Sequence, residues 1–194
     1  MATELTDRSL IEKKFESLIS KSKKYIKTRN KDELATLKNE TENLRERVKH
    51  TIDTLKNDHD LNYLTSLKLT LSIIENFTRS VELMEKLKSK TPIGNEFDTK
   101  QMLDILMPNI KCLIECENWR ENLDPEKLES DYEFIESLEE QHKRVLLSYL
   151  IEDWHNMDEV ITLLKIGEIY KNIAEKLVSL SLISSYVDKV EVKQ

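Results

Sequence analysis

Carboxylate and imidazole side chains recur one helical turn apart along this chain, and such pairs can bind metal ions. Glu139 with His142, and Glu152 with His155, each have the Glu-x-x-His spacing of carboxylate-bridged di-iron bundles. Those sites take their two motifs from different helices that converge on one point. Here both pairs fall on one predicted helix, separated by about 20 Å along its axis. We therefore do not expect them to share a metal centre.

The other chemistry-bearing residues also lack a catalytic arrangement. Cys112 and Cys116 are the only cysteines; they could supply half a metal site, but no second pair exists, and we interpret them as small core residues. The two glycines, Gly94 and Gly167, are too few for a glycine-rich phosphate loop. No Ser-His-Asp or Cys-His motif supports nucleophilic catalysis. The sequence therefore predicts a protein that is not an enzyme.

The composition is typical of long helices. Charged residues make up 35% of the chain, with only two Gly and three Pro. Apolar residues recur at helical spacing in stretches that predict six helices. They cover about 10–26, 31–55, 61–87, a segment from Asp98 that Pro108 should kink or restart, 125–155 and 157–183. The apolar face of the fifth helix includes Leu128, Ile135, Leu138, Val145 and Leu146.

Capping residues mark the starts of these helices. Asn30 followed by Glu33, and Asn156 followed by Glu159, have capping-box spacing. Asp124 precedes Pro125, which suits the first position of a helix. These signals predict helix starts near residues 31, 125 and 157.

Proline and glycine occur together only in the stretch 91–95, Thr-Pro-Ile-Gly-Asn. We predict a linker at 92–95 between a first three-helix bundle, 1–91, and a second, 96–194. Residues 60–79 and 156–175 look like an internal repeat, each a long helical pattern near the end of its half. The predicted fold is all-α, with two tandem three-helix bundles whose neighbouring helices are antiparallel.

The charge is unevenly distributed. The whole chain carries a net charge of -7, which argues against broad nucleic-acid binding. Residues 1–31 nevertheless hold more Lys and Arg than acids. This basic segment is either a solvated helix face or a docking surface for an acidic partner or anionic lipid head groups. We expect no transmembrane segment and no secretory signal, and hence a cytoplasmic protein that could still contact a membrane peripherally.

Two five-residue segments resemble a known motif. Residues 75–79 read Glu-Asn-Phe-Thr-Arg and residues 171–175 read Lys-Asn-Ile-Ala-Glu, within the predicted third and sixth helices. The helix start at 32–35 and the segment 148–153 add to the likeness. In these features the chain resembles the PhoU family, cytoplasmic regulators of phosphate uptake that consist of two tandem three-helix bundles.

The resemblance implies metal sites that have degenerated. In that family the third helix of each bundle carries two carboxylates one turn apart, which help to bind clusters of metal ions. This chain keeps Glu75 and Glu175 but has Arg79 and Lys171 at the other two positions. A cation four residues from a carboxylate can form an ion pair along the helix, worth about 0.2–0.5 kcal/mol. We expect the metal clusters to be lost or much weakened, and no cofactor to be needed.

One set of acids remains as a candidate site. Glu136 and Glu140 lie one turn apart on the fifth predicted helix and could join Glu175 as ligands for iron, manganese or zinc. Ordinary solvated acids are the alternative interpretation.

By resemblance, the chain is a non-enzymatic regulator of phosphate uptake or phosphate signalling. It would contact the ATPase of a phosphate ABC transporter or a sensor kinase, with the basic segment 1–31, Trp119 and Trp154 as candidate interfaces, and could form a homodimer. Trp154 could instead be a core residue. The alternative function is a metal-binding or storage bundle of unrelated role. A helical hydrolase would need Glu136, Glu140 and Glu175 to converge on one pocket.

Overall fold

The computed structural model describes residues 21, 24, 30–54, 61–87, 101–102, 104–106, 124–152 and 154–191. Its long helices are α2 (Lys31–Thr54), α3 (Leu61–Met84), α6 (Pro125–Glu152) and α7 (Met157–Glu191), with a short 3-10 turn, η1 (Trp154–Asn156), before α7. No strand occurs in the described ranges, so the all-α prediction is confirmed. The predicted linker at 92–95, the kink at Pro108, Cys112, Cys116 and Trp119 lie outside the described residues.

The predicted caps lie where the helices begin. The Asn30 Oδ1 accepts a hydrogen bond from the Asp32 N–H at 2.9 Å, and α2 follows. The Asp124 Oδ1 accepts from the N–H groups of Glu126, at 3.1 Å, and Lys127, at 3.3 Å. Each cap satisfies N–H groups that have no partner within the helix.

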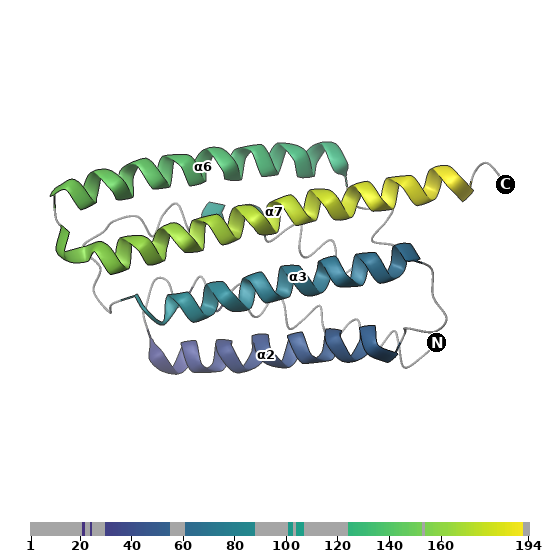
Figure 1. Ribbon diagram of the computed structural model, residues 1–194, viewed down its shortest axis with the longest axis horizontal. Coiled ribbons are helices and arrows are strands. Elements are labelled where there is room, and N and C mark those ends of the chain that lie inside the picture. Colours follow the sequence, from purple (N-terminus) through teal and green to yellow (C-terminus); the bar gives the residue numbers. More distant parts are fainter. Residues whose placement is uncertain are drawn as a thin grey trace.

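The four long helices lie side by side in the order α6, α7, α3, α2 (Figure 1). The hairpins α2–α3 and α6–α7 are antiparallel, as predicted, and α3 and α7 also run in opposite directions. The last helix of the second half, α7, thus packs against α3, the last described helix of the first half.

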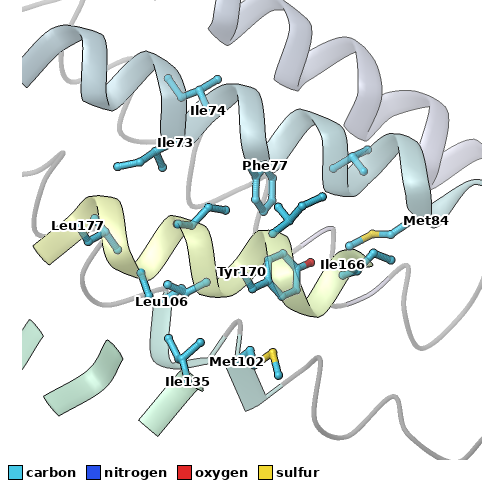
Figure 2. Close-up of a cluster of buried hydrophobic side chains, with 14 of the residues drawn as sticks. Ile73, Ile74, Phe77, Met84, Met102, Leu106, Ile135, Ile166, Tyr170 and Leu177 are labelled. Carbon is cyan, nitrogen blue, oxygen red and sulfur yellow. The ribbon is translucent and has the colours of Figure 1, made fainter. Parts of the chain in front are cut away.

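One apolar core runs through all four helices. At its centre Ile73, Phe77 and Met84 of α3 face Tyr170 and its neighbours on α7 (Figure 2). The apolar residues that recur at helical spacing along α2 are buried, namely Leu34, Leu37, Leu44, Val48 and Ile52. Burial of these side chains in one cluster is the main stabilising term for a helical fold of this kind.

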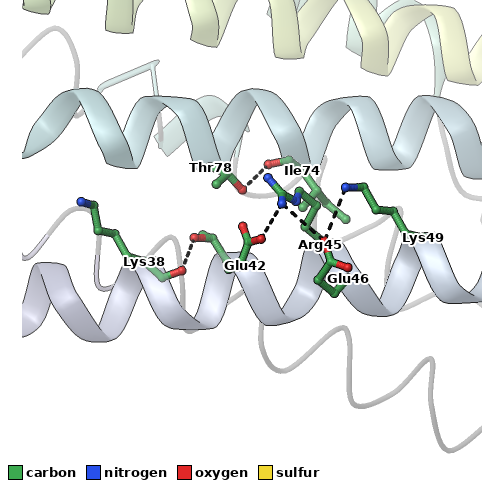
Figure 3. Close-up of polar contacts among 8 residues, drawn as sticks. Lys38, Glu42, Arg45, Glu46, Lys49, Ile74 and Thr78 are labelled. Carbon is green, nitrogen blue, oxygen red and sulfur yellow. Dashed lines mark hydrogen bonds and ion pairs between the residues drawn. The ribbon is translucent and has the colours of Figure 1, made fainter.

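Charged residues line the outer face of α2. Arg45 contacts Glu42 and also Glu46, at 3.4 Å, and Lys49 lies 3.4 Å from Glu46 (Figure 3). Lys38 pairs with Glu85, just after α3, and so links the two helices. These exposed pairs contribute little to stability individually.

Two threonine hydroxyls buried on α2 and α3 are satisfied by the backbone of their own helix. The Thr78 Oγ1 donates to the Ile74 carbonyl at 2.9 Å (Figure 3), and the Thr41 Oγ1 donates to the Leu37 carbonyl at 3.1 Å. Such bonds let α2 and α3 pack closely at small polar residues without leaving a buried donor unpaired.

Candidate functional site at the α6–α7 interface

The two motif positions on α3 point to solvent. Glu75 and Arg79 are both exposed, and they form no ion pair with each other. The pair expected along α3 is therefore not formed. Thr78 and Phe77, between them in the sequence, are buried and face the core.

The motif lysine on α7 makes its contact with another helix. The Lys171 Nζ lies 2.6 Å from the Glu136 Oε1 of α6. The sequence predicted a pair with Glu175, four residues along α7, so this expectation is corrected to a pair between helices. Tyr132, one turn before Glu136, donates its hydroxyl to the same carboxylate at 3.4 Å.

Contacts among Glu136, Lys171 and Tyr132 shift the pKa values of all three side chains. The hydrogen bond from Lys171, together with its positive charge, lowers the pKa of Glu136. The same hydrogen bond raises the pKa of Lys171. Burial raises the pKa of Tyr132, and the negative charge of Glu136 adds to the rise. At neutral pH the group therefore consists of a carboxylate, an ammonium and a neutral phenol.

Two of the three candidate metal ligands are paired with cations. Glu136 binds Lys171, and Glu140 lies 3.2 Å from Arg144 on the same helix. Glu175 is exposed. Across the described ranges, no group of three or more His, Cys, Asp and Glu side chains is placed to hold a metal ion.

The two Glu-x-x-His pairs lie in different surroundings. His142 is only 1% exposed and packs beside Gly167 of α7, where an added Cβ would lie 3.5 Å from its Cδ2. His155 is exposed in η1, with its ring centroid 4.2 Å from that of Trp154. One histidine therefore belongs to the helix interface and the other to the surface of the turn.

Large apolar side chains are exposed where α6 turns into α7. We call this group the apolar turn patch, and it comprises Leu147, Ile151, Trp154, Met157 and Ile161. Ile151 is 88% exposed and Trp154 is 66% exposed. Trp154 is therefore a surface residue, and its alternative interpretation as a core residue is wrong. Val145, predicted on the apolar face of this helix, is exposed as well.

Part of the basic segment is paired within the chain. The Lys21 Nζ lies 2.5 Å from the Glu40 Oε1, and Lys24 pairs with Glu33. A shallow hollow of about 250 Å³ lies beside them, lined by Lys21, Lys24, Asp32, Glu33 and Thr36. For Lys21 and Lys24, these contacts support the interpretation of the basic segment as a solvated helix face.

Sequence reasoning missed the link from α6 to α7 through Tyr132, Glu136 and Lys171. The one-turn spacing of Tyr132 and Glu136 was visible in the sequence. Their partner was not, because it depends on how two helices are aligned along their axes.

Comparison with known proteins adds no assignment. No family model matches the chain, and no curated protein matches it. None of the described helices is long and apolar enough to cross a membrane.

Proposed function

We propose that this chain is a non-enzymatic helical adaptor of the PhoU type that regulates phosphate uptake or phosphate signalling in the cytoplasm. It would bind the ATPase of a phosphate ABC transporter or a sensor kinase. The observation that carries this proposal is the packing of α3 against α7. These two helices carry the two five-residue motif segments of the resemblance, and they form the centre of one continuous core.

The surroundings of the motif residues support an adaptor rather than a metal protein. Lys171 connects α7 to α6 through Glu136, so this position contributes to the scaffold. On α3, Glu75 and Arg79 belong to the outer face of the helix. Charged side chains exposed on a packed helical core are suited to contact a protein surface.

The division into two tandem three-helix bundles belongs to the same proposal. The hairpin α2–α3 would supply two helices of the bundle 1–91, and α6–α7 two helices of the bundle 96–194. The adaptor would act by binding one conformation of its partner more tightly than another, because a ligand shifts an equilibrium only by its differential affinity.

Affinity purification from the native host tests this proposal. The tagged chain is recovered from cells grown with scarce and with ample phosphate, and co-purified proteins are measured by mass spectrometry. We expect a phosphate-transporter ATPase or a phosphate sensor kinase to be enriched. If both are abundant in the lysate but neither is enriched, the phosphate assignment is wrong and only the fold stands.

A pair of charge variants locates the interface. Lys13→Glu with Lys14→Glu changes the basic segment, whereas Lys68→Glu with Lys127→Glu makes the same change of net charge at exposed positions elsewhere. We expect only the first variant to lose the partner. Equal loss in both would indicate a general charge effect rather than a docking surface.

A further inference from the structure

Two lysines of the basic segment are held by acids of α2. The Lys21 Nζ lies 2.5 Å from the Glu40 Oε1, and Lys24 pairs with Glu33. Both glutamates belong to the first three turns of α2, which begins at Lys31. The helix that follows the basic segment therefore supplies the anions that these two ammonium groups bind in the free chain.

These ion pairs are open to competition from another carboxylate. The Lys24 side chain is 64% exposed and the Lys21 side chain 33% exposed, so water reaches both ammonium groups. The Glu40 carboxylate is incompletely satisfied, because its Oε2 is buried and has no hydrogen-bond partner within the described part of the chain. Exposed ion pairs change an equilibrium constant only roughly 1.4- to 5-fold each. A partner's carboxylate can therefore replace either glutamate at small cost.

The two glutamates remain stabilised when the lysines leave them. Glu33 lies in the first turn of α2, where the partial positive charge of the helix N-terminus favours a carboxylate. Glu40 keeps a side-chain exposure of 30%, so water can solvate its charge. Exchange of the lysines to a partner therefore leaves no charge fully buried on α2.

The hollow beside the ion pairs has room for one side chain of a partner. Its volume is about 250 Å³, and it is lined by Lys21, Lys24, Asp32, Glu33 and Thr36. Pockets for small molecules usually measure roughly 300–1,000 Å³, so a single acidic side chain fits better than a metabolite. A flat membrane of anionic lipid fits less well, because Asp32 and Glu33 would be brought against its head groups.

We propose that Lys21 and Lys24 form a docking site for an acidic peptide segment of the regulated partner, and that Glu33 and Glu40 cover this site in the free chain. Carboxylates of the partner replace the two glutamates, and one of them enters the hollow. The lysines thus lie on a solvated face before binding and on a docking surface after it. The site rests on the proposed function, since it takes the basic segment as the contact with the partner.

Titration of the full chain into a fluorescently labelled polyglutamate peptide, followed by anisotropy, tests this site. Glu33→Gln with Glu40→Gln should bind the peptide roughly three- to tenfold more tightly than the wild type, because two exposed pairs no longer compete. Glu129→Gln with Glu133→Gln is the matched control: it makes the same change of net charge at exposed positions of α6, which lies at the opposite end of the row from α2 (Figure 1). An equal gain in both variants would overturn the proposal, as would no binding of the peptide to any variant.

A cycle of substitutions identifies the cations that respond. Lys21→Gln with Lys24→Gln, added to the glutamate variant, should abolish the gain in affinity, because the uncovered ammonium groups are then absent. Circular dichroism verifies that each variant keeps its helix content. A gain that persists without the two lysines would show that Glu33 and Glu40 act on other groups.

A second probe separates an acidic protein segment from a lipid surface. Vesicles that contain anionic lipid should bind the glutamate variant no more tightly than the control variant. Tighter binding to vesicles, without tighter binding to the peptide, would overturn the assignment of a protein partner to this site.

The outcomes also separate this site from the adaptor assignment, because the peptide titration does not require the native partner. If the substitution cycle holds and no phosphate protein is enriched from the host, the phosphate assignment alone is wrong. If a phosphate-transporter ATPase or sensor kinase is enriched equally by the wild type and by Glu33→Gln with Glu40→Gln, the covered docking site alone is wrong.

Discussion

At the scale of single residues, the contact of Lys171 with Glu136 determines what an acid at position 171 would do. Glu136 and Glu175 both lie close enough to Tyr132 to act on its phenol, together with Lys171. A carboxylate at position 171 would therefore join two others near one point. Hard divalent cations require several converging oxygen ligands of this kind.

We expect Lys171→Glu combined with Arg79→Asp to increase affinity for Mn²⁺ over the wild type in titration calorimetry. Most of the gain in affinity should come from Lys171→Glu, because Glu136 of α6 already lies beside position 171. Lys171→Gln, which removes the cation and adds no carboxylate, is the matched control. No gain in the double variant would mean that these positions do not correspond to the family's motif.

The same ion pair predicts a dependence of stability on pH. Since the folded-state pKa of Glu136 lies below its ordinary value of 4.5, its contribution is complete above that value and is lost as pH falls through the folded-state pKa. The wild type should therefore exceed Glu136→Gln in urea midpoint near neutral pH, and the difference should shrink in acid below about pH 4. A difference that stays constant throughout the acid range would contradict this assignment.

At the scale of the helix, Gly167 is a weak point inside α7. A Cβ added there would meet His142 at 3.5 Å, Glu139 at 3.7 Å and Met102 at 4.0 Å, all ordinary contact distances. Glycine within a helix costs about 0.5–1 kcal/mol relative to alanine. The position therefore has room for the methyl group that would remove this cost.

We expect Gly167→Ala to stabilise the protein by about 0.5–1 kcal/mol, which corresponds to about 1–4 °C in Tm for a chain of this size. Thermal unfolding followed by circular dichroism measures it. Gly167→Val adds two further carbons against His142 and should lose this gain. If alanine instead lowers Tm, the approach of α6 to α7 must be closer than described.

At the scale of the whole molecule, the core shared by α3 and α7 predicts that the two halves unfold together. Phe77 is buried on α3, and both tryptophans belong to the second half of the sequence. Phe77→Ala should cost about 3–5 kcal/mol because it leaves a cavity at the centre of the core. Urea unfolding followed by helix content and by tryptophan fluorescence should shift by the same amount.

Glu82→Ala, on the exposed face of α3, is the control and should change stability by less than about 0.5 kcal/mol. If Phe77→Ala moved the helix signal and left the fluorescence transition in place, the halves would be independent units. That outcome would contradict a common core.

Local chemistry was enough to predict the described helices. The helix-start signals act within one turn of the chain, namely the capping side chains of Asn30 and Asp124 and the proline at position 125. They can therefore be recognised without knowing which helices pack nearby. The apolar periodicity of α2 likewise identified its buried face, since a helix has one direction in which such a stripe can point.

Only the tertiary structure decided which side chains meet. Lys171 has Glu175 one turn away in sequence, yet it binds Glu136, because the alignment of α6 with α7 brings that carboxylate to 2.6 Å. Val145 and Trp154 are as apolar as their buried neighbours, and they are exposed because no described helix covers them. Periodicity shows that a face is apolar, but the neighbouring helices determine whether it is buried, and their positions depend on the packing of the whole chain.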